Sequence, residues 1–565
     1  VSSACRLRVG KILSWSRFKA PRGKYAAGSA WPERADSHAP DMALQAQVSR
    51  LPASLVWLIA FLLIFLSNVT AIKAETLDWA TRPATNLLTT NDVATVNGVT
   101  LTTSATTAGT FTATSVQLQP AGTSNGTTGF INSTMNASTD NEAARQIITI
   151  AFSEPVYNVT FTVWDLDGGP AFNDGTNFFN DVLTFTSSAG VPTTGTPGSQ
   201  VTWTPATGRA QATANAGLTN ANGNITVTFA GPVTSVTINH IAGAVTGSNN
   251  PTNQAVYIEN ISFQRAPRLA VQKSSTGGTG STTFNFNVSN SGAGTTATSV
   301  ATSGAAVTGT AIRLNATSTA TTITETGPAG WQISPASSTC TDANSANSGN
   351  PASFAASVSG LVVTVPAVNI RPGAELTCAI TNARLPTVTL TKVSNGGTGG
   401  FTFTGTNGWA SQTITTATAG TGVTGATQTL TAVSTATTIT ETIPAGWQLV
   451  SVTCTGTGGG TQPTVNTTTG AIDFTAAQTA PGSAIACTVT NARRPTVTLT
   501  KVSNGGTGGF TFTGTNGWAS QTITTVTAGT GVTGATQTLT AVSTATTITE
   551  TIPAGWQLVS VTCTG

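Results

Sequence analysis

The sequence is poor in charged residues, which make up only 8% of its 565 residues. So little charge can accompany disorder, but alternating apolar residues persist along the chain, and disordered segments usually lack them. After Ala74 we count 13 basic and 17 acidic residues, and no basic patch is interleaved with aromatics. We therefore expect a folded chain that does not bind nucleic acid.

Histidine is scarcer still, and this limits the possible catalytic sites. Only His240 follows residue 74, so a Ser-His-Asp site would have to use it. It lies between the apolar residues Ile238 and Ile241, where a strand histidine is expected to be structural. No glycosidase motif surrounds the few carboxylates. The sequence therefore predicts that the protein is not an enzyme.

The N-terminal region predicts export. Residues 1–41 hold eight Lys or Arg and three acids without a strand or helix pattern, and Met42 follows. We interpret them as a doubtful leader before a start at Met42, with a long basic leader as the alternative. Residues 42–74 read as a signal peptide, with Arg50, an apolar run over 55–66, and cleavage sites after Ala71 or Ala74. A transmembrane anchor is the alternative, although the run is short. We expect a secreted or cell-surface protein that meets a membrane only through this segment or a missing C-terminal anchor.

The residues that are abundant predict an all-β protein. Thr and Val favour strands, while the 59 Gly and many Asn favour turns. Residues 75–265 contain no internal repeat and predict a separate jelly-roll-like β-sandwich. Its expected strands are Gln146–Phe152, Asn158–Trp164, Asp181–Thr186, Ile225–Phe229, Ser235–Ile241 and Ala255–Phe263.

Two kinds of side chain in this first domain could bind a ligand. The acidic residues Asp165, Asp167, Asp174 and Asp181 sit in or beside a Gly-rich stretch and would suit Ca²⁺, although their spacing does not match an EF-hand. An ordinary solvated turn is the alternative. No other cofactor is expected. Three tryptophans could stack on sugar rings or fill the core: Trp79, Trp164 and Trp203.

The C-terminal half is a tandem array. The segment that begins at Pro386 begins again at Pro495, and over 71 residues the two copies differ only where Ala417 becomes Val526. A divergent first copy precedes them. Repeats of this size are whole domains, which we expect at 267–384, 385–493 and, truncated, 494–565. Such an array points to a spacer or stalk.

The cysteines occur mainly in these copies, two in each complete one. None shows zinc spacing such as CxxC. In an oxidising compartment we expect pairs Cys340–Cys378 and Cys454–Cys487, and Cys563 stays unpaired because the sequence stops two residues later.

Each copy also places polar residues in an apolar row. Because residues i and i+2 of a strand share a face, Lys392 follows Val388 and Leu390. Glu441 follows Ile439 in the same way, and Asn491 follows Val489. The corresponding residues are Lys273, Glu325 and Asn382 in the first copy, and Lys501 and Glu550 in the third. A buried lysine that loses its charge is a nucleophile, so it could displace ammonia from the asparagine and form an isopeptide bond, with the glutamic acid moving the protons.

Each copy resembles the prealbumin-like domains of bacterial pilins and surface adhesins, called SpaA-like or collagen-adhesin B-type. The resemblance covers roughly 267–565. It rests on the strand ending in Lys392, the segment Thr438–Trp447 and the closing Thr490-Asn491. It implies that the lysine bonds to the asparagine with help from the glutamate. The cysteine pair departs from that pattern, so a disulfide could clamp the first strand to the last instead, with the three polar residues only hydrogen-bonded.

We therefore expect a structural or adhesive surface protein, in which the first domain contacts an extracellular polysaccharide or a host or matrix protein. The alternatives are a non-catalytic accessory region of a larger secreted enzyme and a pilin-like subunit.

Overall fold

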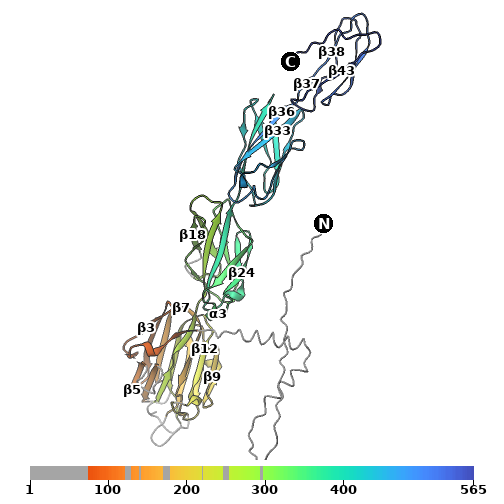
Figure 1. The fold of residues 1–565 in the computed structure, drawn as a ribbon. Helices are drawn as coiled ribbons and strands as arrows, with labels where there is room; N and C mark the ends of the chain where they lie inside the picture. Colours follow the sequence, from red (N-terminus) through yellow and green to blue (C-terminus); the bar gives the residue numbers. More distant parts are fainter. Residues whose placement is uncertain are drawn as a thin grey trace, which may run out of the picture. The chain divides into compact units, whose positions relative to one another are not determined.

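The computed structural model describes residues 74–120, 129–138, 142–169, 179–218, 220–245, 254–292 and 297–565, which form strands joined by turns (Figure 1). Their helical segments are short: α3 (Ser345–Ser348), η1 (Trp79–Thr81), η2 (Pro205–Thr207), η3 (Ala221–Gly223), η4 (Ala367–Asn369) and η5 (Gly458–Gly460). Within these described ranges, no helix has the length and apolar character needed to cross a membrane. The predicted all-β class is confirmed, whereas the expected leader and signal peptide lie outside the described residues.

Residues 75–265, called the head below, contain fifteen described strands, all paired antiparallel. The strands are β1 (Glu75–Leu77), β2 (Thr85–Asn86), β3 (Asp92–Val96), β4 (Val99–Ala108), β5 (Phe111–Gln119), β6 (Phe130–Ala137), β7 (Arg145–Trp164), β8 (Asp181–Ser187), β9 (Thr194–Pro197), β10 (Val201–Thr204), β11 (Arg209–Ala212), β12 (Ile225–Phe229), β13 (Val233–Ala242), β14 (Gln254–Ile258) and β15 (Ile261–Arg265).

The long strand β7 belongs to both layers of the head. Its first half pairs with β4 and β13, and its second half pairs with β12 on one side and with β14 and β15 on the other. The change of partners occurs around Pro155, which cannot donate to a ladder, and Asn158, whose φ is 51°. The two strands predicted over 146–152 and 158–164 are therefore two halves of one. The buried apolar side chains of both layers form one core cluster.

The first copy forms a single connected sheet of eleven strands around its own core. Its strands are β16 (Arg268–Thr276), β17 (Thr282–Val288), β18 (Ala297–Thr302), β19 (Val307–Thr308), β20 (Ile312–Arg313), β21 (Thr321–Glu325), β22 (Trp331–Ile333), β23 (Ser337–Asp342), β24 (Ser353–Ser359), β25 (Val362–Val365) and β26 (Glu375–Arg384). The first strand, β16, pairs in parallel with the last, β26.

The second copy is a sandwich of two five-stranded sheets, ordered β30-β27-β36-β33, with β31 also on β27, and β29-β28-β32-β35-β34. Its strands are β27 (Thr387–Asn395), β28 (Gly399–Gly405), β29 (Gln412–Thr416), β30 (Val423–Thr424), β31 (Gln428–Thr429), β32 (Thr437–Thr442), β33 (Trp447–Thr455), β34 (Thr464–Asn466), β35 (Ala471–Phe474) and β36 (Ala484–Arg493). The first and last strands, β27 and β36, are again parallel neighbours.

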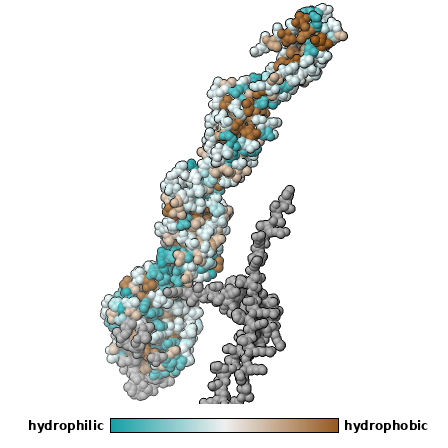
Figure 2. All heavy atoms as spheres, viewed as in Figure 1, coloured by the Kyte–Doolittle hydropathy of each residue, from teal (hydrophilic) through white to brown (hydrophobic). Residues whose placement is uncertain are grey.

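The third copy repeats the early strands of the second in smaller sheets of two, two and three strands. These are β37 (Thr496–Val497), β38 (Thr500–Lys501), β39 (Gly509–Gly514), β40 (Gln521–Thr524), β41 (Val532–Thr533), β42 (Gln537–Thr538) and β43 (Ile548–Thr551). Hydrophobic side chains gather at its surface in Figure 2, and the exposed ones include Val502, Val526, Ile552, Val559 and Val561.

Strand alternation explains how a chain with so little charge forms soluble sandwiches. Val388 and Leu390 on β27 are fully buried, while the alternating Thr389 and Thr391 face out and pair across strands with Thr427 and Thr424, Oγ1 to Oγ1, at 2.7 and 3.0 Å. Threonine is β-branched, so it favours the strand while its hydroxyl meets water. The outer faces of the repeats are therefore polar but nearly uncharged.

Candidate functional site

In the second copy, the three polar residues of the apolar row meet inside the sandwich. Lys392 Nζ donates to Asn491 Oδ1 at 2.8 Å and to backbone carbonyls of β27 and β36 at 3.2 and 3.1 Å. Asn491 Nδ2 donates to Glu441 Oε1 at 2.9 Å, and that oxygen lies 3.5 Å from Nζ. We call Lys392, Glu441 and Asn491 the second-copy cluster. Its geometry fixes the amide orientation, because only the amide oxygen can accept from the lysine.

Burial perturbs both charged members of this cluster. The side chains of Lys392 and Glu441 are completely shielded from solvent. Burial lowers the pKa of Lys392 to about 8, although the nearby carboxyl opposes this change. Burial likewise raises the pKa of Glu441, against the effects of the lysine and of the asparagine hydrogen bond. The cluster therefore moves toward a neutral amine beside a neutral acid.

The first copy builds the same arrangement from a divergent sequence. Lys273 Nζ donates to Asn382 Oδ1 at 2.7 Å and to carbonyls of β16 and β26 at 3.0 and 3.3 Å. Asn382 Nδ2 donates to Glu325 Oε1, whose other oxygen lies 4.0 Å from Nζ. Burial lowers the pKa of Lys273 to about 8 and raises that of Glu325. Lys273, Glu325 and Asn382 form the first-copy cluster.

The third copy shows the pair without an amide. Lys501 Nζ lies 2.5 Å from Glu550 Oε1, and 14% and 8% of the two side chains are exposed. No asparagine joins them among the described residues. A direct ion pair replaces the three-residue arrangement.

Sequence reasoning missed an aromatic member of each cluster. The amines of Lys273, Lys392 and Lys501 lie 4.2, 4.4 and 4.3 Å from the ring centroids of a phenylalanine. The rings are those of Phe284, Phe401 and Phe510. A cation is attracted to such a ring, so the phenylalanine favours the charged amine. The signal was a phenylalanine nine to eleven residues after each lysine.

Both predicted disulfides are present, Cys340–Cys378 and Cys454–Cys487, and Cys563 is free and exposed. Each bond joins the last strand of its copy to an antiparallel neighbour, β23 or β33. The idea that a disulfide could clamp the first strand to the last is therefore wrong, because β16 and β27 contribute no cysteine.

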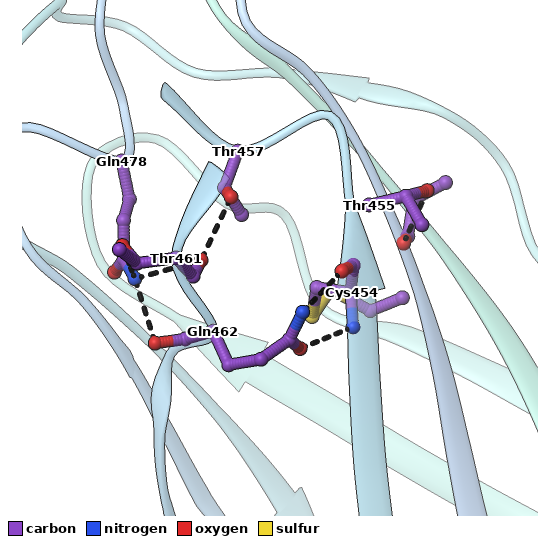
Figure 3. The surroundings of a disulfide bond; sticks show 8 residues. Cys454, Thr455, Thr457, Thr461, Gln462 and Gln478 are labelled. Atoms are coloured by element: carbon purple, nitrogen blue, oxygen red, sulfur yellow. Dashed lines mark hydrogen bonds between the residues drawn. A yellow bond between two sulfur atoms is a disulfide. The ribbon is translucent and has the colours of Figure 1, made fainter. Parts of the chain in front are cut away.

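The side chain of Gln462 lies beside Cys454 of the second disulfide (Figure 3). Gln462 Oε1 accepts from the Cys454 backbone N–H at 2.7 Å, and Gln462 Nε2 donates to the Cys454 carbonyl at 2.7 Å. Gln478 Nε2 donates a hydrogen bond to the Gln462 backbone carbonyl at 2.8 Å. The side chain of Gln462 thus completes the hydrogen bonds of β33 as another strand would, which protects this edge.

The acidic residues predicted to bind Ca²⁺ lie partly together in the head. The Asp167 backbone N–H donates to Asp181 Oδ2 at 3.1 Å. Burial raises the pKa of Asp165 to about 6 and the pKa values of Asp167 and Asp181 to about 8. We call Asp167 and Asp181 the head carboxyl pair. Asp174 lies outside the described residues. Within the described part of the chain, no three His, Cys, Asp or Glu side chains are grouped to hold a metal, and calcium binding stays a prediction.

His240 does join a serine and an aspartate. Its Nδ1 lies 3.0 Å from Ser133 Oγ, and its Nε2 lies 3.4 Å from Asp181 Oδ1. All three residues are completely buried, and burial lowers the pKa of His240 to about 3. Ser133 Oγ also donates to Gln146 Oε1. Because no substrate can reach this hydroxyl, the network is structural. Sequence alone gave no signal for Ser133, which lies 107 residues from the histidine.

The three tryptophans occupy different environments. Trp79 is completely buried, and its Nε1 donates to the Glu259 carbonyl at 2.9 Å. Trp203 packs against Phe185 with ring centroids 6.1 Å apart. Trp164 is half-buried and follows the core residue Val163, so it faces away from the core. Of the three, Trp164 is the one whose side chain faces away from the core.

Comparison with solved structures gives matches of low identity. The Bacillus anthracis TIE protein is 12% identical over 80% of this chain and 69% of its own, with a TM-score of 0.21. The pilus adhesin SpaC of Lactobacillus rhamnosus GG is 17% identical over 71% and 51%, with a TM-score of 0.21. The major pilin T-13 of Streptococcus pyogenes is 14% identical over 40% and 98%, with a TM-score of 0.15. The chain thus spans about half the length of the SpaC adhesin.

No curated protein matches the chain. The prealbumin-like fold domain SpaA_4 matches residues 269–384, 388–493 and 497–565, which together make up about half of the sequence. These are the three copies that carry the lysine and glutamate, which are buried in the first two copies and partly exposed in the third. The chain therefore belongs to the prealbumin-like fold domain family.

Proposed function

We propose that this chain is a secreted or cell-surface structural or adhesive protein without enzymatic turnover. In this proposal the head contacts an extracellular polysaccharide or a host or matrix protein. The repeats are spacers, and each complete one is clamped between its first and last strands.

The observation that carries this proposal is the position of the second-copy cluster. Lys392 and Asn491 lie on β27 and β36, the adjacent parallel first and last strands. Because β27 and β36 run parallel, the start of β27 and the end of β36 lie at opposite ends of this strand pair. Tension between these ends would enter at Thr387, cross at Lys392 and leave through Asn491. The intervening chain of the copy carries little of it.

A covalent clamp would form by displacement of ammonia. The neutral Lys392 amine attacks Cγ of Asn491, the Nζ–Cγ bond forms, and the Cγ–Nδ2 bond breaks. Glu441 is within reach of both nitrogens, so it can give its proton to the leaving Nδ2 and take one from Nζ. The products are one amide and one ammonia, and no cofactor is consumed.

A non-covalent clamp is the competing form. The amine of Lys392 has three oxygen acceptors and a facing aromatic ring, which together suit a protonated ammonium. The cluster would then hold the strands by buried hydrogen bonds alone.

Intact mass of the chain from Glu75 to Gly565 separates the two forms. Two amide bonds, one in each complete copy, would remove about 34 Da in ammonia, and this deficit would survive reduction of the disulfides. A mass that equals the sequence mass after reduction would refute the covalent clamp. Peptide mapping would locate a branched peptide that joins Lys392 to Asn491.

A further inference from the structure

One layer of the head contains β5, β6, β14 and the second half of β7. Its outer face carries a continuous row of amide and aromatic side chains. Gln117 of β5 pairs with Asn132 of β6, Asn132 pairs with Tyr257 of β14, and Tyr257 pairs with Trp164 of β7. Asn224 extends the row, because it precedes Ile225, which pairs with Val163. We call these five residues the amide–aromatic row.

Every member of the row points away from the core. The strand neighbours Val116, Ile131, Val256, Val163 and Ile225 are completely buried, so the alternate positions face outward. The five row residues are all half-buried, so each residue keeps part of its surface accessible. Strands lie about 4.8 Å apart, so the row extends about 20 Å across the sheet. This track has the length of an extended polymer segment.

The aromatic centre of the row is held in place. Phe130 packs edge-on against Tyr257, with ring centroids 5.1 Å apart. Burial, together with the charges of Asp165 and Asp167, raises the pKa of Tyr257, so its hydroxyl keeps its proton and can donate. A fixed aromatic surface with a polar edge suits a ligand that has both apolar and hydroxyl-bearing faces.

Two amides of the row lack a hydrogen-bond donor. Asn132 Oδ1 and Asn224 Oδ1 are enclosed and accept no hydrogen bond from any described residue. A buried acceptor without a donor is costly, and a ligand rich in hydroxyls relieves that cost once the amide turns toward it. This is a second observation, independent of the aromatics, that points to a ligand at the row.

The charge around the row selects among such ligands. Asp165 follows Trp164 directly, and with its pKa raised to about 6 it is negatively charged at neutral pH. The row itself contains no lysine or arginine. An acidic polymer would meet like charge here, which is unfavourable.

We propose that the amide–aromatic row binds an uncharged polysaccharide, with sugar rings on Trp164 and Tyr257 and sugar hydroxyls on the three amides. This rests on the proposed role of the head as the ligand-contacting part and names its ligand class and site. A protein ligand and an acidic polysaccharide are the competing outcomes.

The test is affinity electrophoresis of the full chain in gels that contain soluble starch, mixed-linkage β-glucan, xylan, galactomannan or, as the acidic arm, alginate. Immobilised collagen tests a protein ligand. We expect retardation by at least one neutral polysaccharide. Trp164→Ala and Tyr257→Ala should each weaken it at least tenfold, as expected for anchors of a binding site.

Matched variants keep the test interpretable. Thr160→Ala changes the same face of β7 four residues, or two pleat repeats, away from Trp164, and retardation should be unchanged. Gln117→Ala and Asn132→Ala leave the aromatic packing intact and should weaken binding, so the proposal does not depend on Trp164→Ala folding. A melting temperature for each variant identifies misfolding.

Three results would overturn the proposal. These are retardation that survives both aromatic substitutions, binding to alginate or collagen alone, and no retardation by any neutral polysaccharide. None of these affects the mass of the repeats, so the clamp in the proposed function stands or fails separately.

Discussion

The substitution Glu441→Gln tests the chemistry of the second-copy cluster most directly. Glutamine keeps the shape of the side chain and can still accept from Asn491 Nδ2, but it cannot shuttle a proton. The cluster should stay assembled while the amide fails to form. The mass deficit of the chain from Glu75 to Gly565 should therefore fall from about 34 Da to about 17 Da, with only the first-copy bond left.

The effect on stability follows from the loop that the bond would close. Lys392 and Asn491 are 99 residues apart, and closing a loop of this length stabilises the fold by about 4–5 kcal/mol in the chain-entropy model. For a domain of about this size, each kcal/mol shifts the melting temperature by about 4–8 °C. Calorimetry should therefore show one transition lowered by about 20 °C or more, while the other transitions keep their positions.

Two controls identify the cause of this loss. Glu325→Gln should remove the other half of the deficit and lower a different transition. Asp473→Asn changes another acid of the second copy, which accepts from Thr438 Oγ1 at 2.6 Å, and should leave the mass unchanged. A wild-type chain with no deficit, or a Glu441→Gln chain with the full deficit, would refute the reasoning.

Three further predictions concern other parts of the chain. Replacing both Cys454 and Cys487 with serine should cost about 3–4 kcal/mol from the 33-residue loop but leave the ammonia deficit intact, as calorimetry and mass would show. The head should lose stability between pH 6.5 and 8, because the head carboxyl pair has its pKa raised to about 8 and holds protons there that unfolded aspartates have released. His240, with its pKa lowered to about 3, opposes this trend only below pH 6.5. A urea unfolding midpoint that stays constant between pH 6.5 and 8 would contradict the prediction. An amine-reactive label should reach Lys501, which is partly exposed, before Lys392, and mass mapping after brief labelling would show the reverse order if this is wrong.

Most of the correct predictions from the sequence rested on the alternation of side chains along a strand. It predicted that Lys392, Glu441 and Asn491 share the inner side with apolar residues, and the structure brings them within hydrogen-bonding distance of one another. The rule works here because a two-residue period needs only local sequence. Whether the amide bond forms depends on proton positions and reactivity, and it stays a prediction.

Features that depend on pairing between strands far apart in the chain could not be predicted from the sequence. Strand β7 continues through Pro155, but the local sequence there predicts a break between two strands because proline usually interrupts a strand. The contact of Ser133 with His240 joins strands far apart in the chain. The amide–aromatic row likewise exists only because β5, β6, β14 and β7 meet in a particular register. Alternation tells which way a side chain faces but not which neighbours it meets.

Because β7 serves both layers of the head, neither layer can be lost alone. Opening the layer that contains β4 and β13 would remove the hydrogen-bonding partners of β7 before Pro155. The released half of β7 would then destabilise the other half, which pairs with β12 and β15. The head should therefore melt as one cooperative unit, and slow amide hydrogen exchange should run along the whole of β7 rather than stop at the proline.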